Sequence, residues 1–421
     1  MTKNRPTASE PSVRQSGHAL TWAGVALLAY MLLVGVGVIG DGFKWLSGGA
    51  EGAERIFAFA SNPIVGVILG TLATALVQSS STVTSVIVGL VAGGVPVSIA
   101  VPMIMGANMG TTITNTIVSL GSLREKAAFN RAFQAATVHD FFNLYSILIF
   151  LPVEMLFHPL ERAAGVAAGW FSGGSGASIS DLNFLGAITK PVAAALTGVF
   201  KALPTTVGAS LAIALGMAMV IFSVIYLGRL LRAVMMGSAK GVVDRAIGRG
   251  PAAGVASGTA VTVLVQSSST TTSLVVPLAG AGILTTRQIY PFTLGANIGT
   301  CITALLAATA ITGPYEMVAL QIALVHLFYN LAGVCVFLVI PLLRDLPIRS
   351  AEWLGRRVEV NRGWALGYLL GVFFVLPGGV FGGETLFNGE GTAAEIVEAE
   401  RKEEALEAAE QEVREESMAI E

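Results

Sequence analysis

Long apolar runs constrain the fold of this chain more than any other feature of its sequence. The stretches Leu20 to Ile39, Leu211 to Leu231 and Val318 to Leu342 carry almost no charge, and a helix of about 20 such residues crosses a bilayer. Charged residues make up 12% of the chain, against roughly a quarter in soluble domains. Because backbone polar groups in lipid must bond within the protein, the sequence predicts an all-α membrane protein.

The chain contains one unit twice. The segment QSSSTVTS at 78–85 recurs as QSSSTTTS at 266–273, and GANMGTT at 106–112 recurs as GANIGTC at 295–301. Three further matches follow in the same order: Gln134 with Gln321, His139 with His326, and Asn143 with Asn330. The offsets of the three sets are 188, 189 and 187 residues. A nearly constant offset over ordered matches indicates an internal duplication.

The basic residues predict how the two units are oriented. They cluster before Leu20 and at 124–131, 229–249 and 344–362, and short loops rich in Lys and Arg stay in the cytoplasm. Keeping all four clusters inside requires an odd number of crossings per unit, so we expect two inverted-topology repeats. Each Gln-Ser-Ser-Ser segment then enters and leaves on one side, as a re-entrant helical hairpin, and each repeat also contains broken spanning helices.

The predicted organisation has six parts. They are a cytoplasmic segment at 1–18, transmembrane repeat 1 at 19–172 with its hairpin at about 63–93, an outer loop at 173–190, transmembrane repeat 2 at 191–360 with its hairpin at about 251–282, a final transmembrane helix at 361–383, and an acidic helical or disordered tail at 384–421. The apolar run after His18 is too long for a signal-peptide core, so we expect a retained first span. Without an Asn-x-Ser/Thr sequon, the simplest location for this multi-pass protein is a bacterial inner membrane.

The repeated segments concentrate neutral polar side chains within apolar, membrane-spanning parts of the chain. Such groups in a span are costly unless they are paired or functional. Hydroxyls and amides can both donate and accept, and the free N–H groups at the start of a helix favour an anion. We therefore expect an oxyanion held by neutral groups alone, with cations beside it, at Gln78, Ser79, Ser80, Ser81, Gln266, Ser267, Ser268 and Ser269. The alternative is that these residues only pack helices together.

Asp140 is the one acidic residue in its apolar region, and its repeat mate is Leu327. An intramembrane carboxylate predicts a cation or proton site, whereas the alternative is a carboxylate at the membrane edge. Asn143 lies one helical turn away and could share the same ion. The Gly-Ala-Asn segments add Asn108, Thr111, Asn297 and Thr300 as candidates, although their Gly-x-x-x-Gly spacing also suits close packing.

The chain resembles the type II sodium-phosphate cotransporters. The resemblance rests on the twin Gln-Ser-Ser-Ser segments, the two Gly-Ala-Asn segments, the run 131–143 and the run 151–154, and it covers about residues 62–330. It implies sodium-driven uptake of inorganic phosphate, with phosphate bound by both hairpins. Together with the candidates above, the expected sodium-binding residues are Asp140, Asn143, Asn108, Thr111, Asn297, Thr300, Thr303, Gln266 and Ser267. The resemblance also implies that a member with Asp at position 140 is electrogenic.

Other functions stay open at this point. A sodium-coupled carrier of another anion, such as a dicarboxylate, would also use inverted repeats, and a passive channel is a further alternative. An enzyme is not expected, because no nucleophile–base pair is apparent. We expect no cofactor beyond the transported sodium and no transition metal, since Cys301 and Cys335 lack ligand spacing. The expected partners are phosphate, Na⁺ and lipid, with a homo-dimer possible, and no basic face suggests nucleic acid.

Overall fold

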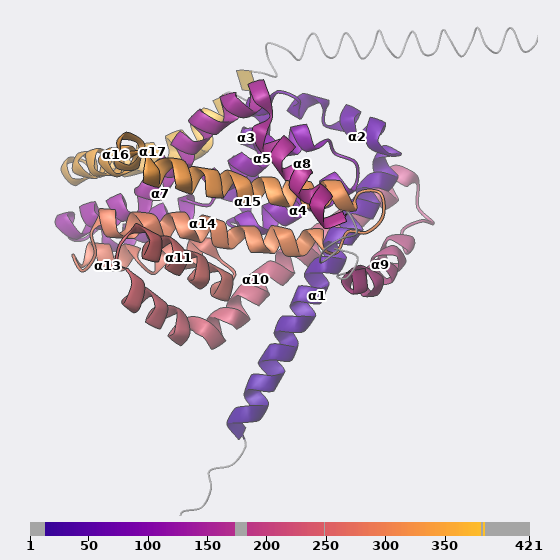
Figure 1. The fold of residues 1–421 in the computed structure, drawn as a ribbon, viewed down its shortest axis with the longest axis horizontal. Helices are drawn as coiled ribbons and strands as arrows, with labels where there is room; N and C mark the ends of the chain where they lie inside the picture. Colours follow the sequence, from indigo (N-terminus) through magenta and orange to yellow (C-terminus); the bar gives the residue numbers. More distant parts are fainter. Residues whose placement is uncertain (1–12, 173–182, 248, 380–381, 384–421) are drawn as a thin grey trace, which may run out of the picture. The chain divides into compact units, whose positions relative to one another are not determined.

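The structure, a computed structural model, describes residues 13–172, 183–247, 249–379 and 382–383. Within these ranges every regular element is a helix (Figure 1). The described residues fall into two units, one that ends at Leu369 and one that begins at Leu370. The described residues of the second unit include one π-helical turn, Gly371–Val375. The predicted tail at 384–421 and most of the segment at 1–18 lie outside the described residues.

The described residues of the first half of the chain form eight α-helices. They are α1 (Val13–Ser47), α2 (Ala50–Ile56), α3 (Pro63–Val77), α4 (Ser80–Ala92), α5 (Val97–Gly110), α6 (Ile113–Ser119), α7 (Lys126–Phe157) and α8 (Pro159–Ser172). Asn62 starts α3 because its side chain accepts a hydrogen bond from the Ile64 amide at 3.0 Å, with Pro63 in the first turn. Both features are typical of helix N-termini.

Nine more α-helices lie in the described part of the second half. They are α9 (Asn183–Gly198), α10 (Thr205–Ala246), α11 (Pro251–Val265), α12 (Ser268–Ser273), α13 (Val276–Gly280), α14 (Thr286–Ala308), α15 (Glu316–Val339), α16 (Pro341–Val360) and α17 (Gly363–Leu370). Thr285 and Gln288 form a capping box at the start of α14. Long helices from the two halves lie side by side, as α1 does with α10 (Figure 1).

Among the described residues, six helices are long and apolar enough to cross a membrane, so the chain is a multi-pass membrane protein. These spans are Leu20–Ser47, Val97–Ser122, Lys126–Phe157, Thr205–Val234, Thr286–Ala308 and Glu316–Val339. The apolar helix Gly363–Gly379 is shorter, and the final transmembrane helix stays a prediction. Residues 173–182 of the predicted outer loop lie outside the described residues.

The expectation of broken spans is right for the first copy and wrong for the second. Helix α5 ends at Gly110 and α6 begins at Ile113, whereas α14 continues unbroken through the matching motif. At the break, the Thr112 hydroxyl donates to the Met109 carbonyl at 2.9 Å, and such side-chain bonds compete with regular helix bonding. The matching Cys301 thiol lies 3.4 Å from the Asn297 carbonyl, so it follows the regular i−4 pattern and leaves α14 intact.

The two copies pack their helices in the same way, α3 on α5 and α11 on α14. A Cβ atom at Gly106 would lie 2.0 Å from the Val67 carbonyl oxygen, and one at Gly295 would lie 2.0 Å from that of Val255. Only glycine allows backbones to approach this closely. The close-packing reading of the Gly-Ala-Asn segments is therefore confirmed for their first glycine.

Candidate functional site

The first Gln-Ser-Ser-Ser motif forms the tip of a helix pair, α3 and α4. Helix α3 ends at Val77, and Gln78 follows with a left-handed backbone of φ 58°. Ser79 caps α4 by accepting a hydrogen bond from the Thr82 amide at 3.2 Å. The left-handed region costs a non-glycine residue about 1–3 kcal/mol and persists where the surroundings demand it.

The second motif repeats this geometry at the tip between α11 and α12. Gln266 has φ 54°, and the Ser267 hydroxyl accepts a hydrogen bond from the Thr270 amide at 3.2 Å. The same unfavourable backbone at the same motif position in both copies indicates a local shape that the protein requires. We therefore treat the two tips as one candidate site.

Both glutamine side chains tie their tips to the following span. The Gln266 amide donates to the Val263 carbonyl at 2.8 Å and accepts from the Thr303 hydroxyl at 2.9 Å. In the first copy, Gln78 donates to the Ala75 carbonyl and accepts from the Thr114 hydroxyl at 2.8 Å. Sequence reasoning missed Thr114, although the repeat offset that matches it to Thr303 could have found it. Both glutamines thus shape the tips through bonds within the protein.

The two tips face one cavity of about 180 Å³. Its polar lining is Gln78, Ser79, Ser80 and Ser81 from the first tip and Gln266, Ser267, Ser268 and Ser269 from the second. The structure therefore brings together all eight residues predicted to bind the anion. Ser80 and Ser268 are 4% and 3% exposed, so their hydroxyls lie inside the protein. Buried hydroxyls of this kind need a partner, which a bound oxyanion would provide.

The expectation that only neutral groups form this site is wrong. Arg229 and Arg232 of α10 also line the cavity. Arg232 donates a hydrogen bond to the Thr270 hydroxyl, just beyond the second tip, and the Arg229 guanidinium lies 4.9 Å from the centre of the Tyr226 ring. Sequence reasoning assigned both arginines to a cytoplasmic cluster. Helix α10 instead runs unbroken from the apolar span through that cluster, which brings these two residues to the tips.

A hydrogen-bonded cluster joins the two halves of the chain near the middle of their spans. The Asn108 side-chain amide donates to the Asn330 side-chain oxygen Oδ1 at 2.8 Å, and the Asn108 side-chain oxygen lies 3.0 Å from His326 Nε2. The repeat-related set is Asn297, which donates to Asn143 at 2.9 Å and lies 2.7 Å from His139 Nε2. Each half therefore supplies the asparagine that the other half binds.

This crossed asparagine–histidine cluster engages three of the residues expected to bind sodium, Asn108, Asn143 and Asn297, in hydrogen bonds within the protein. Asn143 also donates to the Asn108 backbone carbonyl at 3.0 Å, so both ends of its amide are engaged away from Asp140. The Thr111 and Thr300 hydroxyls donate to carbonyls of their own helices, each at 3.1 Å. The sodium roles of Asn108, Asn143, Asn297, Thr111 and Thr300 stay predictions.

Asp140 is completely buried and lies in separate surroundings. Its Oδ2 atom accepts hydrogen bonds from Tyr368 at 3.1 Å and from Thr116 at 3.3 Å. Its Oδ1 atom has no hydrogen-bond partner. A buried carboxylate oxygen without a partner is costly, and a cation or proton at Oδ1 would remove that cost. Tyr368 comes from α17, beyond the second repeat, so the repeat pattern could not have indicated it.

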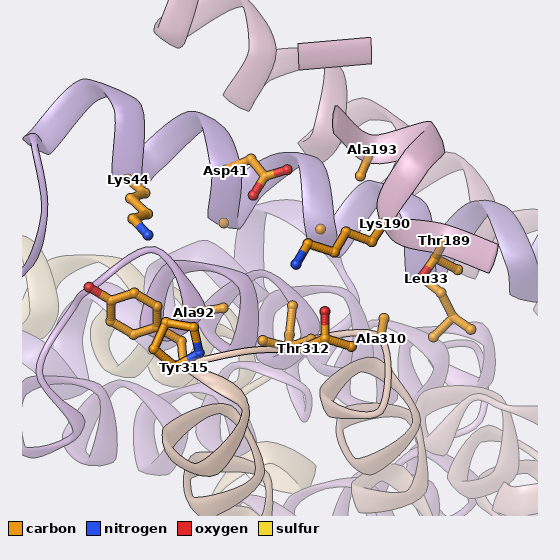
Figure 2. Close-up of a pocket in the computed structure, with 14 residues that line it drawn as sticks. Leu33, Asp41, Lys44, Ala92, Thr189, Lys190, Ala193, Ala310, Thr312 and Tyr315 are labelled. Atoms are coloured by element: carbon orange, nitrogen blue, oxygen red, sulfur yellow. The ribbon is translucent and has the colours of Figure 1, made fainter. Parts of the chain in front are cut away.

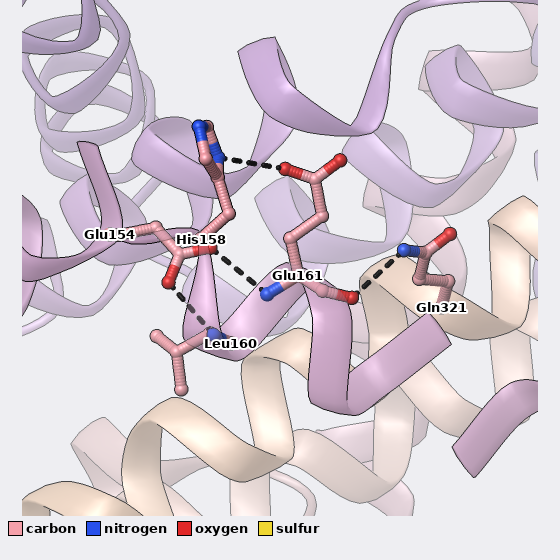
Figure 3. A network of polar contacts seen from close by, with 5 residues as sticks. All are labelled: Glu154, His158, Leu160, Glu161 and Gln321. Atoms are coloured by element: carbon pink, nitrogen blue, oxygen red, sulfur yellow. Dashed lines mark hydrogen bonds and ion pairs between the residues drawn. The ribbon is translucent and has the colours of Figure 1, made fainter. Parts of the chain in front are cut away.

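A second group of ionisable residues lies where α7 meets α8 (Figure 3). Among the described residues, Glu154, His158 and Glu161 place their ligand atoms within 4.8 Å of one another. Both oxygens of Glu154 already accept backbone hydrogen bonds, from Leu160 at 2.8 Å and from Glu161 at 2.9 Å. Glu154 thereby caps the start of α8, and this structural role accounts for the cluster.

Comparison with known proteins identifies the family. A sequence model described as "Na+/Pi-cotransporter" matches residues 31–167 and 219–343. The chain belongs to the Na+/Pi-cotransporter family. This is a family of transporters rather than enzymes. The matched ranges contain both tips, Arg229, Arg232, Asp140 and the crossed asparagine–histidine cluster, whereas Tyr368 lies outside them.

Curated relatives in the Na+/Pi-cotransporter family extend this match. The chain is 33% identical over 443 residues to "Sodium-dependent phosphate transport protein 2B" of Pongo abelii, covering 84% of this chain and 64% of the relative. It is 34% identical over 424 residues to the 2A protein of Rattus norvegicus, covering 84% of this chain and 66% of the relative. The chain thus spans about two thirds of the length of these relatives. No solved structure matches it.

Proposed function

We propose that this protein imports inorganic phosphate together with sodium ions. The observation that carries the proposal is the cavity lined by both Gln-Ser-Ser-Ser tips and by Arg229 and Arg232. Guanidinium groups and hydroxyls are the donors that best suit a tetrahedral oxyanion. The names of the relatives, sodium-dependent phosphate transport proteins, support the same substrate and coupling ion.

Contacts at the ends of α4 and α13 support the proposal that the two helix pairs enter from opposite sides, as in an inverted repeat with alternating access. Gly93, at the end of α4, packs so tightly on Phe43 that a Cβ atom there would lie 2.8 Å from the Phe43 Cβ. The end of α1 that carries Phe43 is expected on the outer side. Gly280, at the end of α13, accepts a hydrogen bond at 2.7 Å from Arg131, in a basic cluster expected inside. The two pairs therefore enter as re-entrant hairpins from opposite sides of a bacterial cell membrane.

Asp140 is the best-supported sodium ligand of the predicted set. Its buried Oδ1 atom lacks a hydrogen-bond partner, and carboxylate oxygens are preferred ligands for hard cations. Sodium binding at Asp140 couples an extra cation to each transported phosphate and makes transport electrogenic. Gln266, Ser267 and Thr303 form a second candidate set at the second tip, since Thr303 and Gln266 are hydrogen-bonded at 2.9 Å.

Uptake into proteoliposomes tests the proposal directly. Purified protein should accumulate radiolabelled phosphate when sodium is high outside, and it should carry a phosphate-dependent inward current. Replacing sodium with choline should abolish both signals. Competition by unlabelled succinate as strong as that by phosphate would instead identify a dicarboxylate carrier, and phosphate flux independent of sodium would identify a passive channel.

Substitution of Arg232 tests the role of positive charge. A charge-assisted hydrogen bond contributes about 1.5–3 kcal/mol, so Arg232→Gln should raise the phosphate KM roughly ten- to a hundredfold. Arg356→Gln is a matched control, because Arg356 is exposed and lies on α16, away from the tips. An unchanged phosphate KM in the folded Arg232→Gln protein would remove this arginine from the proposed site.

A further inference from the structure

A second polar cavity lies at the far end of α4 from the Gln-Ser-Ser-Ser tips. Its volume is about 170 Å³, and it is bounded by α1, α9, the end of α4 at Ala92 and the segment between α14 and α15. Helix α4 separates Ala92 from Ser80 by about 18 Å, at 1.5 Å per residue. This cavity is therefore distinct from the one between the tips.

Charged side chains enter this cavity from two helices (Figure 2). Asp41 and Lys44 come from α1, and Lys190 comes from α9. Figure 2 shows the amino groups of both lysines directed toward the segment that carries Thr312 and Tyr315. The Lys44 amino group lies 5.3 Å from the centre of the Tyr315 ring, and cation–π attraction of this kind holds the charge in place.

These three charges do not neutralise one another directly. Among the ion pairs between described residues, none joins Asp41 to Lys44 or to Lys190. The cavity therefore carries two ammonium groups and one carboxylate with space between them. Two lysine ammonium groups beside a threonine hydroxyl suit a phosphate group, because each amino group can donate to a separate phosphate oxygen.

Apolar side chains also line the cavity. Leu33, Ala193 and Ile311 line it, and Leu33 precedes Asp41 by two turns of α1, which is about 12 Å. The segments around the cavity are those that the charge pattern assigns to the outer membrane surface. Charged and apolar lining side chains at the outer membrane surface together match a phospholipid, whereas the charged side chains alone match free phosphate.

We propose that the cavity bounded by Asp41, Lys44 and Lys190 binds a phosphate group, supplied either by inorganic phosphate or by the headgroup of a phosphatidylethanolamine lipid. The two lysines hold the phosphate oxygens. Asp41 faces the same space and distinguishes the two sources: it repels a free dianion, whereas it pairs with the amine of the lipid headgroup. This site is independent of the proposed transport site between the tips.

The experiment measures binding to full-length protein, by thermal unfolding in detergent for inorganic phosphate and in nanodiscs for lipid. The measurements with inorganic phosphate use the Arg232→Gln variant, in which phosphate should bind more weakly to the cavity between the tips. The lipid arm compares phosphatidylethanolamine with phosphatidylcholine. Lys44→Gln combined with Lys190→Gln should weaken binding of the true ligand at least tenfold. Lys126→Gln, at an exposed lysine on α7, is the matched control.

The Asp41→Asn variant identifies the source of the phosphate group, because its effect on binding differs between the two ligands. It also provides the test if the double lysine variant does not fold. Tighter inorganic phosphate binding in this variant supports the free anion. Loss of the preference for phosphatidylethanolamine supports the lipid headgroup. The proposal is overturned if neither probe stabilises the protein, or if the lysine and Asp41 variants bind both probes like the wild-type protein. Sodium-driven uptake is measured in parallel, so failure of this site and failure of the transport proposal give different results.

Discussion

The crossed asparagine–histidine cluster gives the sharpest test of how the two halves are held together. Substitution of Asn108 with Ala removes the donor to Asn330 and the partner of His326 Nε2, at 2.8 and 3.0 Å. Both remaining groups are buried, at 2% and 0% exposure, so water cannot replace the lost bonds. A buried polar group without a partner costs about 1–3 kcal/mol. Two such groups predict a loss of about 2–6 kcal/mol in the free energy of unfolding.

The assay is reversible denaturant unfolding of the purified protein in micelles, followed by tryptophan fluorescence. Asn297→Ala should cost a similar amount, because its two bonds repeat the same geometry. Thr309→Val is the matched control, since its hydroxyl bonds only to the Leu306 carbonyl one turn away. In a double-mutant cycle, His326→Ala should cost less in the Asn108→Ala background than alone.

One result would refute this reasoning. If the free energy of unfolding of Asn108→Ala lies within about 0.5 kcal/mol of the wild-type value, the cluster does not hold the halves together. If the same variant also needs much more sodium for half-maximal uptake, Asn108 is a sodium ligand, as the sequence predicts. A structural role predicts the opposite pattern, with reduced stability and an unchanged sodium dependence in the protein that remains folded.

Three further predictions concern packing and coupling. Gly258→Ala should destabilise the protein by about 1–3 kcal/mol or more, because its Cβ would lie 2.0 Å from the Phe292 carbonyl oxygen. Gly367→Ala is the control, because nothing lies within 4 Å of its Cβ. Equal free energies of unfolding for the two variants would contradict the packing argument. Asp140→Gly should abolish the phosphate-evoked current while sparing uptake, so a full current in this variant would exclude a charge-coupling role. Tyr368→Phe removes one of two hydrogen bonds to Asp140 Oδ2 and should change the sodium dependence of uptake without changing the phosphate KM; a change in the phosphate KM alone would contradict it.

Patterns in the sequence were sufficient to predict an all-α membrane protein, the duplication and the eight residues at the two tips, whereas the final transmembrane helix stays a prediction. Apolar runs, Gln-Ser-Ser-Ser motifs and Gly-Ala-Asn segments are local signals, and local sequence determines helices and their ends. The left-handed Gln78 and Gln266 were not predicted, since their conformation also depends on bonds to Thr114 and Thr303 in the next span. The unbroken α14 was missed because the repeat suggested equal copies, whereas Thr112 and Cys301 bond differently to the backbone.

By itself, then, the sequence determined an all-α membrane protein of duplicated architecture, because hydropathy and repetition act along the chain. Only the tertiary structure decided which side chains meet. Asn108 and Asn330 lie 222 residues apart in the chain, and Asp140 and Tyr368 lie 228 apart. Arg229 and Arg232 look like residues of a cytoplasmic cluster until the packing of α10 brings them beside the two tips. Such meetings depend on how whole helices pack, and helix packing depends on the shape of every contacting face.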